Sequence, residues 1–419
     1  MYLELIEVKN YSIDLNLRTI DKADVVVIGG GPSGVAAAIA AARNKKRVIL
    51  IETSAQLGGM ATLGGVAIYM PVGNFTGIFK ELMTEFIPKQ VEDALNGKDP
   101  WPFAFQFNPI LFRHYLNMKM EREGVQVYYH TTFAKTIKDG NCLRAIVVNT
   151  REGLFVIEGK RFVDCTGDAR VAIDAGANYT TGREEDHVTQ PVTLMMIMQN
   201  THQPVDSTLP EDCYFYETVE DLPQGRLLSW ERCGDGSMLI NMTRVKGNGA
   251  RIEDINYFEK EALKQALSVA NYLQRNGYPT YKLVNVAPQA GVRQTNQVEG
   301  LYKLGEVDIF NALQHADAVA STNYGIDIHS PDGAKTCDVR DVSTYDIPYR
   351  CMVPVGIENL LVSGRAISAT HVAMSSARVM PTCYALGEAA GVAVALSIDK
   401  DCALKDIPIK DLENNFKKT

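Results

Sequence analysis

A glycine-rich turn near the N-terminus constrains the fold of this chain more than any other feature. The segment ADVVVIGGGPSG contains the apolar run Val25–Ile28, which predicts a strand buried on both faces. Gly29, Gly31 and Gly34 follow in the spacing GxGxxG, and the alanine-rich segment Val35–Arg43 predicts a helix directly after them. Glycines spaced in this way between a buried strand and a helix are typical of a dinucleotide-binding βαβ unit.

Each residue of this unit has a physical role in binding a dinucleotide. Gly29 permits the tight turn, Gly31 lets a pyrophosphate approach the backbone, and Gly34 lets the helix pack closely on the sheet. The free N–H groups at the helix N-terminus attract the phosphates. Arg47–Ile51 predicts a second strand, and Glu52 at its end is placed to accept hydrogen bonds from ribose hydroxyls. The motif alone does not separate NAD from FAD.

The stretch Thr53–Phe79 follows this acid and carries no charged residue. Its length raises the question of a membrane span, but its many glycines, Pro71 and Asn74 do not suit a helix in lipid. We therefore predict a system of glycine-rich loops that lies against a buried group. A simple nicotinamide dehydrogenase would continue into another helix and strand, whereas a long loop is able to wrap an extended cofactor.

At this loop the sequence TSAQLGGMATLGG resembles the FAD-dependent oxidoreductases with a glutathione-reductase-like flavin fold, which are related to the fumarate reductase and succinate dehydrogenase flavoproteins. In that family the glycine pair, here Gly58 and Gly59, lies near the ribityl and phosphate part of the flavin. The segments YDIPYRCMVP, SGRAISATHVAMSSARVMP and ALGEAAG look most like a bacterial group known only as FAD-dependent oxidoreductases.

Three further segments carry the same resemblance. An alternating strand is expected at Val125–Ala134, and the resemblance places its end near adenine, at Phe133. The apolar segment Phe162–Asp168, FVDCTGD, resembles the family's strand ending in Ala-Thr-Gly-Asp, with Cys165 in the alanine place. The segment NLLVSGR spans Asn359–Arg365.

The segment Cys383–Leu396 resembles the closing helix of that family. Its N-terminus, near Gly387 and Glu388, would then point at the flavin pyrimidine, where the positive end of a helix dipole stabilises the anionic reduced flavin. The resemblance thus implies FAD as the cofactor. The residues expected to bind it are Gly29, Gly31, Pro32, Ser33, Gly34, Glu52, Thr53, Gly58, Gly59, Met60, Ala61, Phe133, Thr166, Gly167, Asp168, Gly364, Arg365, Gly387 and Ala389.

The middle of the chain differs in composition and predicts an inserted domain. Thr189–Gln199 is a methionine-rich apolar run that suits a buried strand, and Ser237–Thr243 suits another. Asp254–Arg275 has the apolar spacing of a helix. The fold class is therefore α/β: a discontinuous Rossmann-like FAD-binding domain over residues 1–186 and 285–419, with an inserted α+β substrate or cap domain over residues 187–284.

Composition limits the partners and the compartment. The formal net charge is −8 and no long block of like charge occurs, which argues against a nucleic-acid arm or a basic membrane patch. The eight cysteines include no C-x-x-C pair, so a structural zinc site is not expected. The first residues lack the pattern of a secretory signal, and we predict a cytoplasmic protein with free thiols. The oligomeric state stays open.

The predicted catalytic residues are His371, Arg378 and Arg293. His371 and Arg378 lie in a segment that leads into the closing helix, and a histidine there is suited to exchange a proton or bind a carboxylate. Two roles are open for Arg378. It either binds an anionic substrate or the flavin, or it forms a structural ion pair with a carboxylate such as Glu388. A further possible group of site residues is His315 with Asp327 and His329, the last two in YGIDIHS; no complete metal-ligand set is visible.

The function predicted from these features is hydride transfer between a small organic substrate and flavin N5, either as dehydrogenation or as reduction of an activated C=C bond. An external electron donor or acceptor completes the cycle. Since no second GxGxxG follows a strand, a dedicated nicotinamide domain is not evident, and a partner-dependent electron-transfer subunit stays an alternative. An FAD-dependent RNA-modifying protein is a further alternative, which the acidic charge disfavours.

Overall fold

The structure is a computed structural model that describes residues 11–12, 14–72, 75–98, 103–232, 235–330, 332 and 337–416. Gly73 and Asn74 of the uncharged stretch, and Cys233, lie outside the described residues, as do residues 1–10 of the N-terminal segment that lacks a signal pattern. The seven described cysteines are free thiols.

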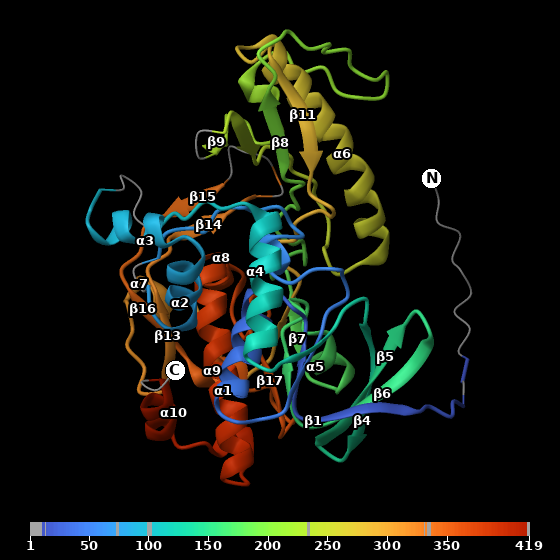
Figure 1. Cartoon of the computed structure of the whole chain (residues 1–419), viewed down its shortest axis with the longest axis vertical. Helices are drawn as coiled ribbons and strands as arrows, with labels where there is room; N and C mark the ends of the chain where they lie inside the picture. Colours follow the sequence, from blue (N-terminus) through green and yellow to red (C-terminus); the bar gives the residue numbers. More distant parts are fainter. Residues whose placement is uncertain are drawn as a thin grey trace.

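A parallel sheet forms the centre of the lower part of the molecule (Figure 1). Its strands are β1 (Thr19–Ile28), β2 (Val48–Ile51), β3 (Gln126–Tyr128), β6 (Gly153–Asp164) and β17 (Leu360–Val362). They lie in the order β3-β2-β1-β6, and β17 pairs with the end of β6. The chain is thus a mixed α/β protein with a Rossmann-like parallel sheet, as the glycine motif predicts.

The segment predicted as one strand at Val125–Ala134 is two strands. β3 joins the parallel sheet, while β4 (Thr132–Asp139) forms an antiparallel meander with β5 (Cys142–Thr150) and β6. The chain turns between them at His130, which has a left-handed φ of 49°. Alternating apolar residues predict strand backbone but give no sign of a turn at a histidine, which is why the sequence pattern misses the break.

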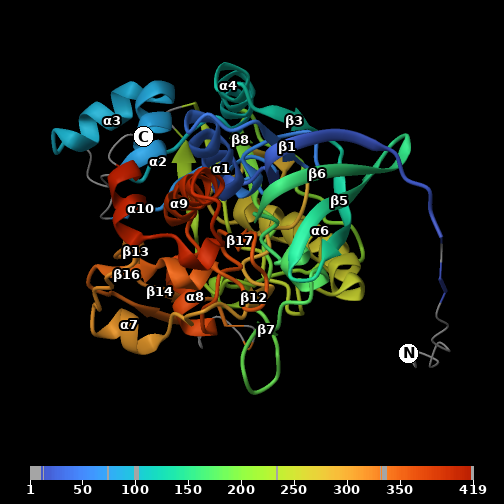
Figure 2. The ribbon, with the colours of Figure 1, turned by 90° about the horizontal axis from the view of Figure 1, so that it is seen from below.

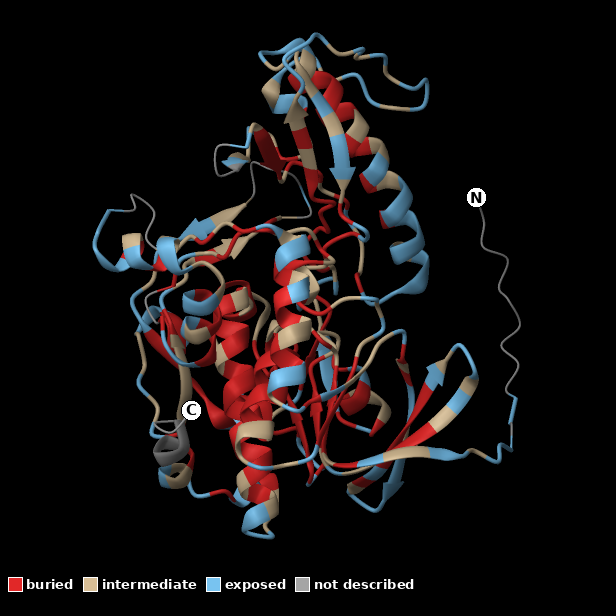
Figure 3. Ribbon diagram, viewed as in Figure 1, coloured by how far each residue is buried: buried red, intermediate tan, exposed pale blue. Residues whose placement is uncertain are grey.

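Helices α1 (Pro32–Arg43) and α9 (Met380–Asp399) lie side by side against the sheet (Figure 2). Within the described residues, α9 is the one helix long and apolar enough to cross a membrane, and 89% of its most apolar window is buried inside the protein. The colouring by burial in Figure 3 shows the same pair as the buried centre of the molecule. The helix predicted at Cys383–Leu396 is confirmed, with an earlier start.

Backbone contact between these two helices depends on two glycines of α9. A Cβ built on Gly387 would lie 2.1 Å from the carbonyl oxygen of Ser33, and one on Gly391 would lie 2.3 Å from that of Ala37. No side chain fits such a gap, so glycine at both positions sets the spacing of the helices.

A second sheet stands above the first and forms the upper lobe in Figure 1. It has the order β11-β8-β10-β9, with β8 at Met196–Asn200, β9 at Ser229–Arg232, β10 at Ser237–Ile240 and β11 at Tyr281–Val286. Helix α6 (Ile252–Arg275) packs beside β11, and its outer face is exposed (Figure 3). We call these elements the cap.

The cap agrees with the predicted insertion in most of its elements. The helix expected at Asp254–Arg275 and the strand expected at Ser237–Thr243 are both present. The strand expected at Thr189–Gln199 begins only at Met196; the buried segment before it makes isolated bridges from Val192 and Thr193 instead. The division of the chain into domains at residues 187 and 284 remains a prediction, and β11 extends past its second boundary.

The remaining elements connect these layers and the two chain ends. They are η1 (Gly59–Ala61), α2 (Gly77–Phe86), α3 (Pro88–Leu95), α4 (Pro109–Arg122), α5 (Arg170–Asp174), β7 (Tyr179–Thr181), η2 (Val219–Asp221), β12 (Asn296–Val298), α7 (Glu306–Phe310), β13 (Ala318–Thr322), β14 (Ile326–Ile328), β15 (Asp338–Arg340), β16 (Tyr345–Pro348), η4 (Tyr349–Met352), α8 (His371–Ala377), η5 (Leu404–Asp406) and α10 (Ile409–Phe416).

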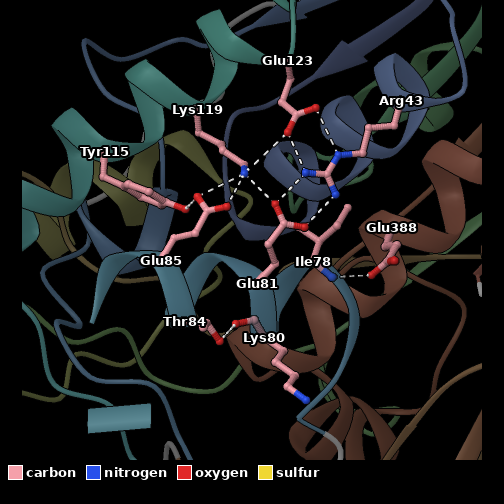
Figure 4. Close-up of polar contacts among 10 residues, drawn as sticks. All are labelled: Arg43, Ile78, Lys80, Glu81, Thr84, Glu85, Tyr115, Lys119, Glu123 and Glu388. Carbon is pink, nitrogen blue, oxygen red and sulfur yellow. Dashed lines mark hydrogen bonds and ion pairs between the residues drawn. The ribbon is translucent and has the colours of Figure 1, made fainter. Parts of the chain in front are cut away.

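A network of part-buried charges ties the end of α1 to α2 and α4 (Figure 4). Arg43 donates to both carboxylate oxygens of Glu81 at 2.6 and 2.7 Å and to those of Glu123 at 2.6 and 3.1 Å. Lys119 donates to Glu81 at 2.5 Å and to Glu85 at 3.0 Å. The hydrogen bonds from Arg43 lower the pKa of Glu81 to about 2. These bonds hold the helices beside the sheet and leave its carboxyl edge free.

Candidate functional site

A large cavity of about 650 Å³ opens at the carboxyl ends of β1 and β2 and continues beneath the cap. The edge of a parallel sheet where the strands end is the usual ligand site of such folds. We call the part lined by Gly29–Ser33, Glu52 and Thr166–Asp168 the glycine end. The part lined by Thr193, Trp230, Asn241, Arg293 and Asp327 is called the cap end.

Most of the predicted residues line this cavity. At the glycine end these are Gly29, Gly31, Pro32, Ser33, Glu52, Thr53, Gly59, Met60, Phe133, Thr166, Gly167, Asp168, Gly364 and Arg365, and at the cap end they are Arg293 and Arg378. Two segments far apart in the chain meet at the glycine end, where the hydroxyl oxygen of Ser33 lies 2.6 Å from that of Ser363.

The N-terminus of α1 opens into the glycine end. Gly31 is its N-cap residue; no side chain among the described residues caps the helix, and its first turn holds no acidic residue. A Cβ built on Gly31 would find its nearest neighbour, the Cα of Gly59, 4.0 Å away. The space in front of this turn is therefore empty of protein, which fits a bound phosphate stabilised by the helix N-terminus.

Glu52 stands at the rim of the glycine end in a fixed orientation. Its Oε2 accepts a hydrogen bond from the N–H of Gly30 at 2.8 Å, and its Oε1 accepts one from the N–H of Ser54 at 2.7 Å. A carboxylate has about four acceptor sites, so two backbone bonds leave capacity for ribose hydroxyls.

Asp168 and Arg365 form an ion pair on the opposite wall of the glycine end. Nη2 of Arg365 lies 2.8 Å from Oδ1 of Asp168. Gly167 has φ of +78°, and a Cβ there would lie 2.7 Å from the guanidinium carbon of Arg365. The charges at this wall are therefore matched, and glycine is required for the arginine to lie against the backbone.

Five predicted cofactor residues do not lie among the described lining residues: Gly34, Gly58, Ala61, Gly387 and Ala389. The physical reason is that they are packing positions behind the cavity. A Cβ on Gly34 would lie 1.8 Å from the carbonyl oxygen of Gly29, and Ala61 and Ala389 are completely buried. The helix N-terminus expected near Gly387 is instead at Met380, which does line the cavity.

His371, which the sequence predicts to be catalytic, also lies outside the described lining residues. It is the first residue of α8, and burial together with the charge of Arg183 lowers its pKa. The sequence places it close to Arg378, but of the two only Arg378 is part of the described cavity wall. The structure thus gives the predicted catalytic role of His371 no support.

The polar group that faces the cap end comes from the segment YGIDIHS around β14. Nε2 of His329 lies 3.4 Å from Oδ2 of Asp327, and the hydroxyl of Tyr324 donates to the same oxygen at 3.3 Å. Arg378 donates from Nη2 to the backbone oxygen of Asp327 at 3.1 Å and lies 3.3 Å from its Oδ2. Arg378 thus pairs with Asp327 rather than with Glu388, which accepts a bond from the N–H of Ile78 (Figure 4).

The charges around this group fix its protonation at neutral pH. Burial and the nearby charge of Arg293 lower the pKa of His329 to about 3, so its imidazole is neutral. Burial would raise the pKa of Asp327, but His329, Arg378 and Arg293 outweigh it and lower that pKa overall. A neutral ring that donates from Nε2 keeps Nδ1 as an acceptor, so His329 is able to accept a proton, as a weak base while the charge of Arg293 is not neutralised.

Two arginines stand beside this group without a carboxylate of their own. Arg293 donates to the backbone oxygen of Pro191 at 2.6 Å. Arg244 lies directly behind the wall and donates to Thr193 at 2.7 Å and to Asn241 at 2.9 Å. Sequence reasoning misses Arg244, because a single arginine after the strand SMLI carries no signal of its own.

The model of the family described as FAD dependent oxidoreductase matches residues 24–416. The chain belongs to this family. Its cofactor is therefore FAD, and it is an oxidoreductase whose substrate the family does not specify. The residues of the glycine end fit FAD. The N-terminus of α1 presents free N–H groups to the open space in front of Gly31, and the cavity volume lies within the range of ligand and cofactor sites.

Several solved structures match the chain at low identity. A geranylgeranyl bacteriochlorophyll reductase-like protein from Thermoplasma acidophilum matches at 13% identity and a TM-score of 0.46, over 95% of this chain and 83% of its own. The p-nitrophenol 4-monooxygenase PnpA from Pseudomonas putida matches at 10% identity and a TM-score of 0.45, over 94% and 83%. THI4 from Thermovibrio ammonificans matches at 22% identity and a TM-score of 0.31, over 39% and 67%.

These similarities are too low to carry an argument about function. No curated protein matches the chain. The relation to the fumarate reductase and succinate dehydrogenase flavoproteins stays a prediction.

Proposed function

We propose that this FAD-dependent oxidoreductase moves a hydride between carbon of a small organic substrate, bound at the cap end, and the flavin. The observation that carries the proposal is the position of Tyr324, Asp327 and His329 in the wall of the same cavity that holds the glycine end. FAD supplies the two-electron carrier when it is bound. The chain's own residues supply the substrate chamber and the proton acceptor.

The proton balance assigns a role to His329. When a substrate is dehydrogenated, its hydride leaves with two electrons and a proton must leave another atom of the substrate. The neutral imidazole accepts that proton, and Asp327 stabilises the resulting cation at 3.4 Å. In the reverse direction, the protonated ring returns the proton to a substrate whose activated C=C bond accepts the hydride.

The same group argues against the two alternative functions. A subunit that only passes electrons to a protein partner needs no proton acceptor in its cavity. An RNA-modifying protein needs a basic face, and this chain has a formal net charge of −8. An external small electron donor or acceptor remains part of the proposal, since the hydride must enter or leave the enzyme in each cycle.

The test is an anaerobic screen of small metabolites against the purified, FAD-loaded protein. Loss of the visible flavin absorbance on mixing with one compound supports substrate dehydrogenation. For the reverse direction, the flavin is first reduced chemically, and its reoxidation by compounds with activated C=C bonds is followed without oxygen. Reduction only in the presence of a second protein from the source cells, and by no small compound, would contradict the proposal.

A further inference from the structure

The cap end holds more positive than negative charge in its buried wall. Arg293 and Arg378 lie in this wall and Arg244 lies directly behind it, and among the described residues Asp327 is the one part-buried carboxylate facing them. Glu259 also lines this end, but it is exposed to solvent, as is Arg226. Buried charges in folded proteins are normally paired, so an excess of this kind implies a counterion supplied from outside.

Several N–H donors of these arginines have no acceptor. Nε and Nη2 of Arg244 and Nε of Arg378 are buried, and no hydrogen-bond partner exists for them within the described part of the chain. At the glycine end, Nε of Arg365 is also buried without a partner in the described part of the chain, but Asp168 neutralises the charge of this single arginine, whereas Asp327 faces three. Unpaired buried donors are rare in folded proteins and are expected where a ligand completes the site.

The ionisation of the arginines agrees with this geometry. Burial and the charge of Arg378 lower the pKa of Arg293 to about 9. Burial and the charge of Arg293 lower the pKa of Arg244 as well. Arg43, which has two carboxylate partners, has its pKa raised instead. The cap-end arginines are thus held in a charged state that the protein alone does not stabilise.

We propose that the substrate bound at the cap end is an organic carboxylate, neutralised by Arg293 and Arg378 in the cavity wall and by Arg244 directly behind it. The proposal rests on the function proposed above for the same cavity and names its substrate class. Planar guanidinium groups suit a carboxylate, because two parallel N–H donors match its two oxygens.

A bound carboxylate also acts on the proton acceptor. The charge of Arg293 is one reason why His329 resists protonation. An anion that neutralises Arg293 removes this repulsion, so the imidazole becomes a stronger base once the substrate is in place. Arg244 does not line the cavity and acts through the field at the site, which makes it a positioning residue.

The experiment measures binding to the FAD-loaded protein by the change in its visible flavin spectrum, with benzoate and lactate as carboxylate probes and benzamide and lactamide as neutral matches. Ionic strength is held constant with sodium chloride. We expect each carboxylate to bind about 10- to 100-fold more tightly than its amide, the effect of one charged hydrogen-bonded contact. Turnover is not needed, so binding is judged separately from the proposed redox reaction.

Two variants locate the preference, a third separates charge from donor geometry, and a fourth controls for the loss of a charge elsewhere. Arg244→Gln and Arg378→Gln are expected to remove most of the carboxylate preference while benzamide binding changes little. Arg244→Lys, which keeps the charge but not the planar donors, is expected to retain part of it. Arg350→Gln breaks an ion pair with Asp317 away from the cavity and should leave the preference intact.

Equal binding of carboxylates and amides would overturn the inference, since it would mean that the flavin itself satisfies these donors. The inference also fails if no carboxylate perturbs the spectrum of a protein that contains its FAD. If the preference is present but no metabolite reduces the flavin, the carboxylate site stands and the proposed function fails. If neutral metabolites reduce the flavin and the preference is absent, the function stands and the carboxylate site fails.

Discussion

The two ends of the cavity are built on different principles. At the glycine end, backbone groups and small residues form the wall, and the charges are matched, as in the pair Asp168–Arg365. At the cap end, Arg293 and Arg378 lie in a wall that also holds apolar residues such as Trp230, and together with Arg244 behind it they outnumber the carboxylate of Asp327. The part of the cavity that binds the same cofactor in every cycle balances its own charge, whereas the part that meets a changing substrate leaves its charge to be neutralised by that substrate.

The largest effect is expected at the glycine end, for Gly31→Val. A Cβ at Gly31 would meet no protein atom closer than 4.0 Å, so we expect the fold to tolerate a small side chain, which fills the space in front of the α1 N-terminus. The variant should fold with an unchanged thermal midpoint of the FAD-free protein, yet purify without FAD and without activity. Flavin content after unfolding and the midpoint measure the two effects; full retention of FAD would show that the phosphates lie elsewhere.

At the cap end, His329→Gln should have the next largest effect. It keeps a polar side chain but removes the proton acceptor, so turnover of the substrate found in the screen should fall about 100- to 10,000-fold. FAD content should stay the same, which separates this end from the other. Tyr324→Phe, which removes a donor to Asp327 at 3.3 Å, serves as the milder companion. Unchanged turnover in His329→Gln would remove this residue from the mechanism.

The helix contact beneath both ends is tested by Gly391→Ala. The new methyl group would lie 2.3 Å from the carbonyl oxygen of Ala37, so α1 and α9 must separate. Overpacking of this kind costs about 1–3 kcal/mol, and we expect the free energy of unfolding in urea to fall by that amount. Helix propensity alone would make Gly391→Ala more stable by about 1 kcal/mol. An unchanged or increased free energy of unfolding would therefore refute the role of backbone contact.

The smallest effect is expected outside the cavity, for Glu81→Gln in the network of Arg43 and Lys119. We expect a loss of about 1–2 kcal/mol at pH 7, after allowing for the screening of a part-exposed group. The folded-state pKa of Glu81 is lowered from 4.5 to about 2, so its contribution is complete above pH 4.5 and is lost as pH falls toward 2. Urea unfolding across this pH range measures it. Glu92→Gln, at an exposed pair with Lys89, is the matched control.

The sequence predicts the two ends unequally, and the reason is physical. Gly29, Gly31 and Glu52 lie in one continuous βαβ unit, so local spacing determines their placement. The cap end joins Arg244 and Arg378, which are distant in the chain, and only the tertiary fold brings them together. The close packing at Gly34 follows from the same local spacing, whereas the packing of Gly387 against Ser33 does not, because a glycine required by helix packing and one required by a cofactor look alike in a sequence.

His371 illustrates the same limit. Arg378 lies in the described cavity wall and His371 does not, because spacing alone does not say which residues of a helix end face a cavity; the catalytic role of His371 stays a prediction. His329, in the loop YGIDIHS, is only one of several possible site residues in the sequence, and it is β14 that places it beside Asp327.

The contact between the hydroxyls of Ser33 and Ser363 has a consequence for how the protein forms. The glycine end begins with β1 and the turn after it, but β17 and α9, which are distant in the chain, complete it. Contacts between such distant segments form late, because the chain loses the entropy of closing a long loop before these contacts stabilise it. A chain in which β17 and α9 have not yet folded therefore has the glycine motif but no finished phosphate site, and stable capture of FAD must await the folding of these two elements.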